Sequence, residues 1–290
     1  MINIIKSHSS DRFFEKGKST KVVTHSGQFH ADEVFSVALL NLYHRDITVL
    51  RTREAEIVEK AKEDPSIFVL DVGMEYDPSR LNFDHHQVDG DDELSTVALL
   101  FQHLFPYYRN DKNLFELYMR LIKGLSDWDT GKISTPRKLN RYPLFLPQLI
   151  SAFNRMVEPS QDQQFIKAVN FSHTVLANEM NTAKEIVFSK EIWSRKKIIH
   201  QDAVLLDHYC AFWRTIQDKP KFKYIVQPEA ENWSVVSVNS KDYPLPTIVS
   251  HNFQKINMSK VVFQHKSKFI TVFKELKDAL TFVNEIKNNQ

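Results

Sequence analysis

The sequence predicts an α/β domain with a parallel sheet, followed by a smaller α+β domain. In the first half, short and almost continuously apolar strands alternate with helices, which is typical of parallel strands buried on both faces. In the last third, closely spaced strands replace this alternation and one helix closes the chain. A length of 290 residues also suits two domains better than one small one.

The first half can be followed element by element. Residues 1–20 are polar and lack periodicity, so we expect a mobile N-terminal tail with at most a brief ordered start. Strands are expected at 21–25, 47–50 and 67–70, and helices at 32–44, 54–63, 95–107, 113–125 and from 160 to about 195. The first domain, including the long connecting helix, is therefore expected to span residues 21–195.

The last third of the chain has a different pattern of expected elements. Apolar and β-branched runs predict strands at 222–226, 233–238 and 261–263, and a final helix fits residues 274–287. We expect this second, smaller domain to span residues 196–290.

Composition excludes several classes of protein. Charged residues make up 26% and the formal net charge is only +2, which argues against a disordered chain and against a general nucleic-acid coat. The single cysteine, Cys210, excludes an intrachain disulfide and a cysteine-rich zinc site. No apolar run is long enough for a membrane span, and the start is too polar for a signal peptide, so a cytoplasmic protein is expected, with organellar or nuclear location left open.

Glycine is scarce and unevenly placed. All six glycines precede Lys132, so the second half has no glycine-rich loop that could hold a phosphate. The chain also lacks the usual sequence patterns of dinucleotide-binding and P-loop sites.

Metal-capable side chains gather at four places in the first half. They are the segment 24–33, Asp71 at the end of a predicted strand, the Asp84–His86 run, and Asp127 with Asp129 after a predicted helix. Ligands of open parallel sheets bind at the carboxyl ends of the strands, where His25 and Asp71 are expected. Imidazoles combined with carboxylates suit Mn²⁺, Fe²⁺, Co²⁺ or Zn²⁺, and their number favours two ions that share one carboxylate. The alternative is that these residues are helix caps and turn residues.

The same residues carry a resemblance to a known family. Asp84-His85-His86 resembles the name-giving motif of the DHH phosphoesterase superfamily. Within it, the closest similarity is to the melanocyte-proliferating-gene exonuclease family, whose hallmarks THxGxFHxDE, DVG-x-YDP and FDHHQ resemble residues 24–33, 71–78 and 83–87. The similarity is specific over residues 20–105 and thins further on, which suggests a divergent member.

The resemblance implies roles for individual residues. His25, His30, Asp32 and His85 would bind metal, and Asp71 would bridge two ions. Asp84 would orient His85, and His86 would face the phosphate. Two divalent ions are implied, Mn²⁺ before Mg²⁺, Co²⁺, Fe²⁺ or Zn²⁺.

Two departures from the family pattern concern the rest of the site. The fourth motif, D-x-x-D-N-G in the family, is replaced by Ser126-Asp127-Trp128-Asp129-Thr130-Gly131, in which Asp127 is favoured as the ligand and Asp129 is the alternative. A Gly-Phe-Ile-Gly-Gly-His segment of the family aligns with residues 268–273, where those glycines and the histidine are missing. Lys268 and His265 could supply charge instead, as point contacts, or the segment is an ordinary strand. Other basic residues that could contact the substrate are Arg51, Arg53 and Lys123, unless they are solvated surface residues.

The implied activity is metal-dependent phosphodiester hydrolysis, as a 3′–5′ exonuclease on single-stranded RNA or short oligonucleotides. Two alternatives stay open. One is a phosphatase of small phosphate esters or pyrophosphate, and the other is a non-catalytic metal-binding protein that has lost the glycine-rich substrate motif. Association into a homo-oligomer is also left open.

Overall fold

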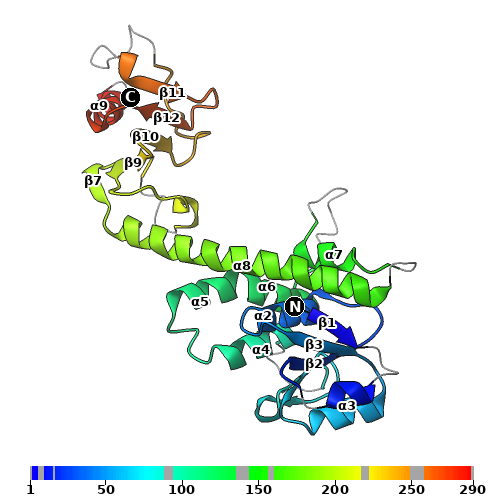
Figure 1. The fold of residues 1–290 in the computed structure, drawn as a ribbon. Coiled ribbons are helices and arrows are strands. Elements are labelled where there is room, and N and C mark those ends of the chain that lie inside the picture. Colours follow the sequence, from blue (N-terminus) through cyan, green and yellow to red (C-terminus); the bar gives the residue numbers. More distant parts are fainter. Residues whose placement is uncertain are drawn as a thin grey trace. The chain divides into compact units, whose positions relative to one another are not determined.

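A computed structural model describes most of the chain as two compact units, residues 1–183 and residues 184–290, which are considered separately (Figure 1). The boundary falls inside a long helix, α8 (Gln161–Ser194). The described residues are 2–5, 10–15, 17–87, 94–134, 144–155, 160–216, 222–248 and 258–288.

The first unit is built on a six-stranded sheet with the strand order β1-β3-β2-β4-β6-β5. The strands are β1 (Ile2–Ile5), β2 (Thr20–Thr24), β3 (Ile47–Arg51), β4 (Ile67–Leu70), β5 (Tyr76–Asp77) and β6 (Asn82–Phe83). Every neighbouring pair is parallel except β5 with β6. The predicted parallel sheet is therefore confirmed, with one short antiparallel strand at its edge.

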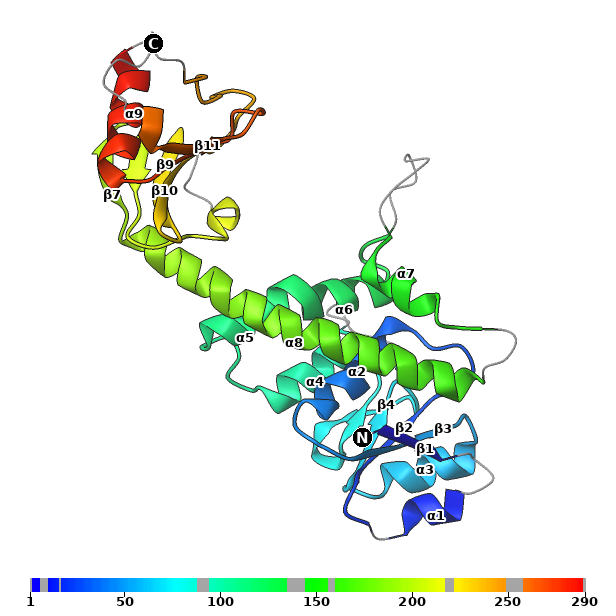
Figure 2. The same cartoon turned by 45° about the horizontal axis from the view of Figure 1, so that its top comes forward.

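Helices cover both faces of this sheet, as Figure 2 shows. The helices of the first unit are α1 (Ser10–Phe14), α2 (Ala31–Asn41), α3 (Ala55–Lys62), α4 (Thr96–Leu104), α5 (Lys112–Leu117), α6 (Lys123–Asp129) and α7 (Leu146–Ser151), with the first part of α8. Because side chains alternate along a strand, Phe68 and Leu70 of β4 join the core under α2 and α4. Ile67 and Val69 join a second core with α1 and α3. Each central strand is thus buried on both faces.

The helix that carries the fourth motif is longer than predicted. A π-helical stretch, η3 (Tyr118–Ile122), joins α5 to α6, so the helical path continues to Asp129. Asp127 and Asp129 therefore lie in the last turn of α6 and point in different directions, instead of following a helix that ends near Gly124. The wider π turn changes the helical register, which a count of 3.6 residues per turn does not include.

Part of the predicted tail is folded. Ile2–Ile5 pairs in parallel with β3 and forms the edge of the sheet. Phe13 of α1 is buried in the core beside α3. No periodic pattern predicts these two elements, because each is only four or five residues long and gains its stability from the rest of the unit.

The second unit has its own six-stranded sheet, in the order β11-β12-β10-β9-β8-β7. Its strands are β7 (Lys197–His200), β8 (Ala203–Leu205), β9 (Tyr224–Glu229), β10 (Asn232–Ser237), β11 (Val261–Gln264) and β12 (Ile270–Phe273), and α9 (Leu276–Asn288) follows them. All pairs are antiparallel except β8 with β9. A core formed by Phe273, Phe282 and neighbouring side chains joins α9 to the sheet.

Among the described helices, we find none whose length and apolar character would allow it to cross a membrane.

Candidate metal centre

Three adjacent strands bring the predicted metal ligands to one edge of the first sheet. His25 follows β2, Asp71 follows β4, and Asp84-His85-His86 follows β6. Because β2, β4 and β6 are neighbours and run in parallel, their carboxyl ends lie side by side. This is the edge at which ligands of open parallel sheets bind.

Helix α2 begins at the same edge and adds its first turn. The His30 N–H donates to Glu33 Oε1 at 2.8 Å, which caps the start of the helix. Asp32 is buried and its two oxygens accept hydrogen bonds from the Ser95 hydroxyl and from the N–H groups of Thr96 and Val97, at the start of α4. Asp32 thus fixes one helix N-terminus against another while keeping its carboxylate at the site.

Histidines and carboxylates form three groups, each with its ligand atoms within 4.8 Å of one another. The groups are His25, His30, Glu33 and Asp71, then Asp71, His85 and His86, and finally Asp32, His85 and Asp129. Asp71 joins the first two groups and His85 joins the last two. The three groups therefore form one continuous cluster.

Asp71 presents its two oxygens to different imidazoles. Asp71 Oδ2 lies 3.5 Å from His25 Nε2, and Asp71 Oδ1 lies 3.4 Å from His85 Nε2. Its backbone φ is +56°, a left-handed conformation that few non-glycine residues adopt. This turn directly after β4 aims the carboxylate across the cluster, where it can connect two binding positions.

Imidazoles and carboxylates lie close together inside the cluster, and their interactions shift several pKa values. Burial would lower the pKa of His25, but Asp71 and Glu33 outweigh it and raise that pKa to about 10. Burial would also lower the pKa of His85, but the nearby carboxylates of Asp129 and Asp71 outweigh it and raise that pKa to about 10. Burial would raise the pKa of Asp71, but the imidazoles of His25 and His85 hold it well below its usual range. Burial and the charges of Asp71 and Asp129 raise the pKa of Asp32 well above its usual range.

The donor set fits divalent cations. Glu33 Oε2 and His85 Nε2 are buried and have no hydrogen-bond partner among the described residues. His85 Nε2 nevertheless lies 3.1 Å from Asp129 Oδ2 and 3.8 Å from Asp32 Oδ2. A metal ion would replace the protons on the imidazoles, pair the orphaned atoms and balance the buried carboxylates. Mixed imidazole and carboxylate ligands suit Mn²⁺, Fe²⁺, Co²⁺ or Zn²⁺.

Asp84 contacts His86, not His85 as the family resemblance implies. The Asp84 Oδ1 atom lies 2.6 Å from His86 Nδ1 and accepts the His86 backbone N–H at 3.1 Å. The hydrogen bond with Asp84 is the main cause that raises the pKa of His86, whose side chain is 53% exposed. Asp84 itself is buried, so it holds an accessible imidazole in a fixed orientation.

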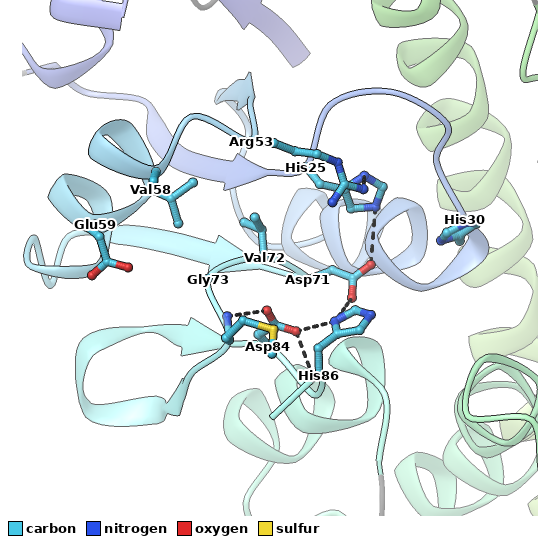
Figure 3. A pocket seen from close by; sticks show the side chains of 12 residues that line it. His25, His30, Arg53, Val58, Glu59, Asp71, Val72, Gly73, Asp84 and His86 are labelled. Atoms are coloured by element: carbon cyan, nitrogen blue, oxygen red, sulfur yellow. Dashed lines mark hydrogen bonds and ion pairs between the residues drawn. The ribbon is translucent and has the colours of Figure 1, made fainter. Parts of the chain in front are cut away.

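A cavity of about 460 Å³ opens onto this cluster. Figure 3 shows His25, Asp71, Asp84 and His86 around it, with the loop that follows β4 forming one wall. Arg53 also lines it and holds the turn after β2, through Nε to the Ser26 carbonyl at 3.1 Å and through a terminal nitrogen to His25 Nδ1 at 3.0 Å. Arg53 thus adds an exposed guanidinium to the lining of this cavity.

The structure places two predicted site residues elsewhere. Arg51, expected to contact substrate, is buried between the rings of Phe29 and Phe165 and donates to Asp162 and to the Gly27 carbonyl. Asp127, the favoured ligand in the fourth motif, forms an ion pair with Lys123. Asp129, the alternative, takes the place beside His85.

His265 and Lys268 lie in the second unit, near the start of β12. Lys268 has a φ of +58°, the left-handed conformation that the glycine of the family pattern would adopt freely. Thr271 and Val272 pair with β10 and β11 inside an ordinary strand. The substrate role of His265 and Lys268 stays a prediction.

Glu33 and Arg53 are not among the ligands or substrate contacts expected with most weight from the sequence. Glu33 lies inside the THxGxFHxDE pattern and is fully buried. Its position, three residues after a helix cap in a motif rich in ligands, is the sequence signal that points to it. Arg53 lines the cavity, and no sequence pattern distinguishes it from other basic residues near the site.

Comparison with known sequences shows similarity to MYG1 proteins. Residues 21–105 match a family model named MYG1_exonuc, described as an uncharacterised protein family, UPF0160. A MYG1 protein of Schizosaccharomyces pombe is 23% identical over 263 residues, which cover 76% of this chain and 79% of that protein. The human MYG1 exonuclease is 39% identical over 80 residues, covering 27% of this chain and 20% of that protein.

A MYG1 protein of Dictyostelium discoideum is 36% identical over 142 residues, which cover 42% of this chain and 40% of that protein. The matches thus span well under two thirds of the human and Dictyostelium relatives. Among solved structures, Thermus thermophilus RecJ in complex with Mn²⁺ aligns with 92% of this chain and 52% of that chain, at 11% identity and a TM-score of 0.27. A score that low has no bearing on the fold.

Proposed function

Because residues 21–105 make this chain a divergent member of the MYG1 exonuclease family, we propose that it hydrolyses phosphodiester bonds with divalent metal ions. The observation that carries the proposal is Asp71, whose two oxygens face different imidazoles within one buried cluster. A carboxylate placed in this way can join two metal ions, as the two-ion mechanism of phosphodiester hydrolysis requires.

The cluster divides naturally into two ligand sets. His25, His30, Glu33 and Asp71 would hold one ion, and Asp32, His85 and Asp129 would hold the other, with Asp71 3.4 Å from His85. We propose Mn²⁺ as the preferred ion, with Mg²⁺, Co²⁺, Fe²⁺ and Zn²⁺ as substitutes. When bound, such ions supply Lewis acidity and lower the pKa of a coordinated water towards about 7.

The remaining residues act on the substrate. His86 is accessible, and its raised pKa favours the protonated imidazole, which donates to a phosphate oxygen. Asp84 keeps that imidazole oriented towards the cavity. Arg53 adds a permanent positive charge to the lining of the same cavity, where it attracts the substrate's phosphate groups.

We propose single-stranded RNA or short oligonucleotides as the substrate, degraded from the 3′ end. The net charge of +2 supports a short substrate, because affinity for long nucleic acids comes from many phosphate contacts. The human relative is named an exonuclease, which supports attack from an end.

The experiment uses the full chain, stripped with a chelator and resupplied with Mn²⁺, Mg²⁺, Co²⁺ or Zn²⁺. Hydrolysis of bis-p-nitrophenyl phosphate tests phosphodiesterase chemistry, and RNA labelled at either end tests direction. Asp71→Asn should abolish turnover, and Asp77→Asn is the matched control because Asp77 is a half-exposed helix cap outside the cluster. Metal-independent hydrolysis, or full activity in Asp71→Asn, would overturn the proposal.

A second candidate is a phosphatase of small phosphate esters or pyrophosphate. The observation in its favour is β12, where Thr271 and Val272 fill an ordinary strand in place of the adjacent glycines of the family pattern. Bulky residues there prevent a close backbone approach to a terminal nucleotide. Release of phosphate from pyrophosphate, without shortening of labelled RNA, would select this candidate. Metal binding without either reaction would select a non-catalytic protein.

A further inference from the structure

A second cavity adjoins the candidate metal centre. Its volume is about 370 Å³, within the range of small-molecule sites. His30 lines both this cavity and the one that opens onto Asp71 and His86. Asp129, whose Oδ2 lies 3.1 Å from His85 Nε2, also lines the second cavity. A ligand bound there therefore has metal-capable groups at one end.

The chemistry of the second cavity changes away from that end. Trp128, in the last turn of α6, contributes a half-buried indole, and Leu125 and Pro147 add apolar surface from α6 and α7. The ring of Phe145 lies 5.5 Å from the Trp128 ring and limits its movement. The cavity thus combines a flat aromatic wall with an adjoining end that carries metal-capable groups.

We propose that this cavity holds a nucleobase, stacked on Trp128, of the nucleotide whose phosphate lies at the metal centre. The inference rests on the proposed function, and it adds the part of the substrate that the metal cluster does not contact. An indole face stacks on any base, and such stacking contributes about 1–3 kcal/mol per base.

The polar groups of the cavity favour stacking over reading of the base edge. Gln148 Oε1 already accepts the N–H of Phe145 at 2.9 Å, so this oxygen is engaged in capping α7. His30 and Asp129 belong to the metal-capable groups. A site of this composition discriminates weakly between bases and strongly between a nucleotide and the same phosphate without a base.

The test compares adenosine monophosphate with ribose 5-phosphate, which carries the same sugar phosphate without the base. Calorimetric titration of the full chain with Mn²⁺ present gives both affinities. Wild type should bind adenosine monophosphate about 5- to 150-fold more tightly. Trp128→Ala should remove this preference, and Trp128→Phe should keep most of it. Leu149→Ala, an exposed position on α7 outside the cavity lining, is the matched control and should keep it fully.

The ratio of the two affinities measures the contribution of the base to binding, because the two ligands differ only in the base. Trp128 precedes Asp129, so a substitution that disturbed metal binding would weaken both ligands equally and leave the ratio unchanged. If Trp128→Ala lost affinity equally for the two ligands, so that their ratio stayed unchanged, the inference would be overturned. A wild-type protein that binds both ligands equally well would also overturn it. These measurements need no turnover.

A hydrolysis assay then separates this inference from the proposed function. The substrates are an oligonucleotide with an intact terminal base and one that is abasic at that position. Trp128-dependent binding without hydrolysis of either would leave the base site standing and overturn the proposed function. Hydrolysis of both at equal rates, with no Trp128-dependent binding, would do the reverse.

Discussion

Asp84 Oδ1 lies 2.6 Å from Nδ1 of His86, and Asp84 Oδ2 accepts the N–H of Met74 at 2.7 Å. The carboxylate therefore joins the loop after β4 to the exposed imidazole that follows β6. One buried residue thus fixes the loop and orients the accessible imidazole of His86 at the cavity.

This contact predicts that Asp84 acts through His86. Asp84→Asn should lower the turnover of bis-p-nitrophenyl phosphate about 10- to 100-fold, because an imidazole without its orienting carboxylate loses position and charge. The double variant Asp84→Asn/His86→Ala should be no slower than His86→Ala alone, since the two residues form one unit. Losses that multiply in the double variant would show that Asp84 acts independently. Thermal unfolding midpoints check that each variant is folded.

The fourth motif gives a second prediction. Asp129→Asn should weaken Mn²⁺ binding at least tenfold, since Asp129 Oδ2 lies 3.1 Å from His85 Nε2 inside a metal-capable group. Asp127→Asn is the matched variant two residues away and should bind Mn²⁺ nearly as wild type does, because Asp127 pairs with Lys123. Calorimetric titration of Mn²⁺ into both variants decides between the carboxylates. The opposite ranking would restore Asp127 as the ligand.

The sequence predicts where the site lies better than which atoms form it. His25 and Asp71 are placed at the edge of the sheet because strands β2 and β4 can be recognised from apolar runs, and parallel strands end at the same edge. The choice between Asp127 and Asp129 depends on the helical register after η3. A π-helical stretch leaves no pattern that periodicity can detect.

Arg51 shows a second limit of prediction from sequence, which is that burial by tertiary packing leaves no local pattern. A basic residue at the end of a strand beside metal ligands resembles a substrate contact, and only tertiary packing reveals that Phe29 and Phe165 enclose its guanidinium. Phe165 comes from α8, more than a hundred residues along the chain. The burial of Glu33 is equally a product of packing between α2 and the strand ends.

Arg51 is accordingly predicted to be structural. Arg51→Met should lower the free energy of unfolding by about 2 kcal/mol or more, because the Gly27 carbonyl loses a charged donor and the two rings lose a cation. Arg53→Met, an exposed arginine two residues on with two hydrogen bonds near the surface, should cost less, about 1 kcal/mol. Chemical denaturation followed by circular dichroism measures both. A stable Arg51→Met protein with a raised KM would return Arg51 to the substrate site.

Glu33 tests whether the cluster is built for metal. Its Oε2 atom is buried without a hydrogen-bond partner among the described residues, while Oε1 lies 2.9 Å from His25 Nε2. Mn²⁺ at 100 times its dissociation constant should stabilise the wild-type protein by about 2.7 kcal/mol, and a chelator should reverse this. In Glu33→Gln the ion loses a charged ligand, so the same Mn²⁺ concentration should give a clearly smaller gain. Glu63→Gln, an exposed glutamate after α3, is the matched control and should respond as wild type does. Thermal unfolding with and without Mn²⁺ measures all three, and an equal gain in Glu33→Gln would remove Glu33 from the ligand set.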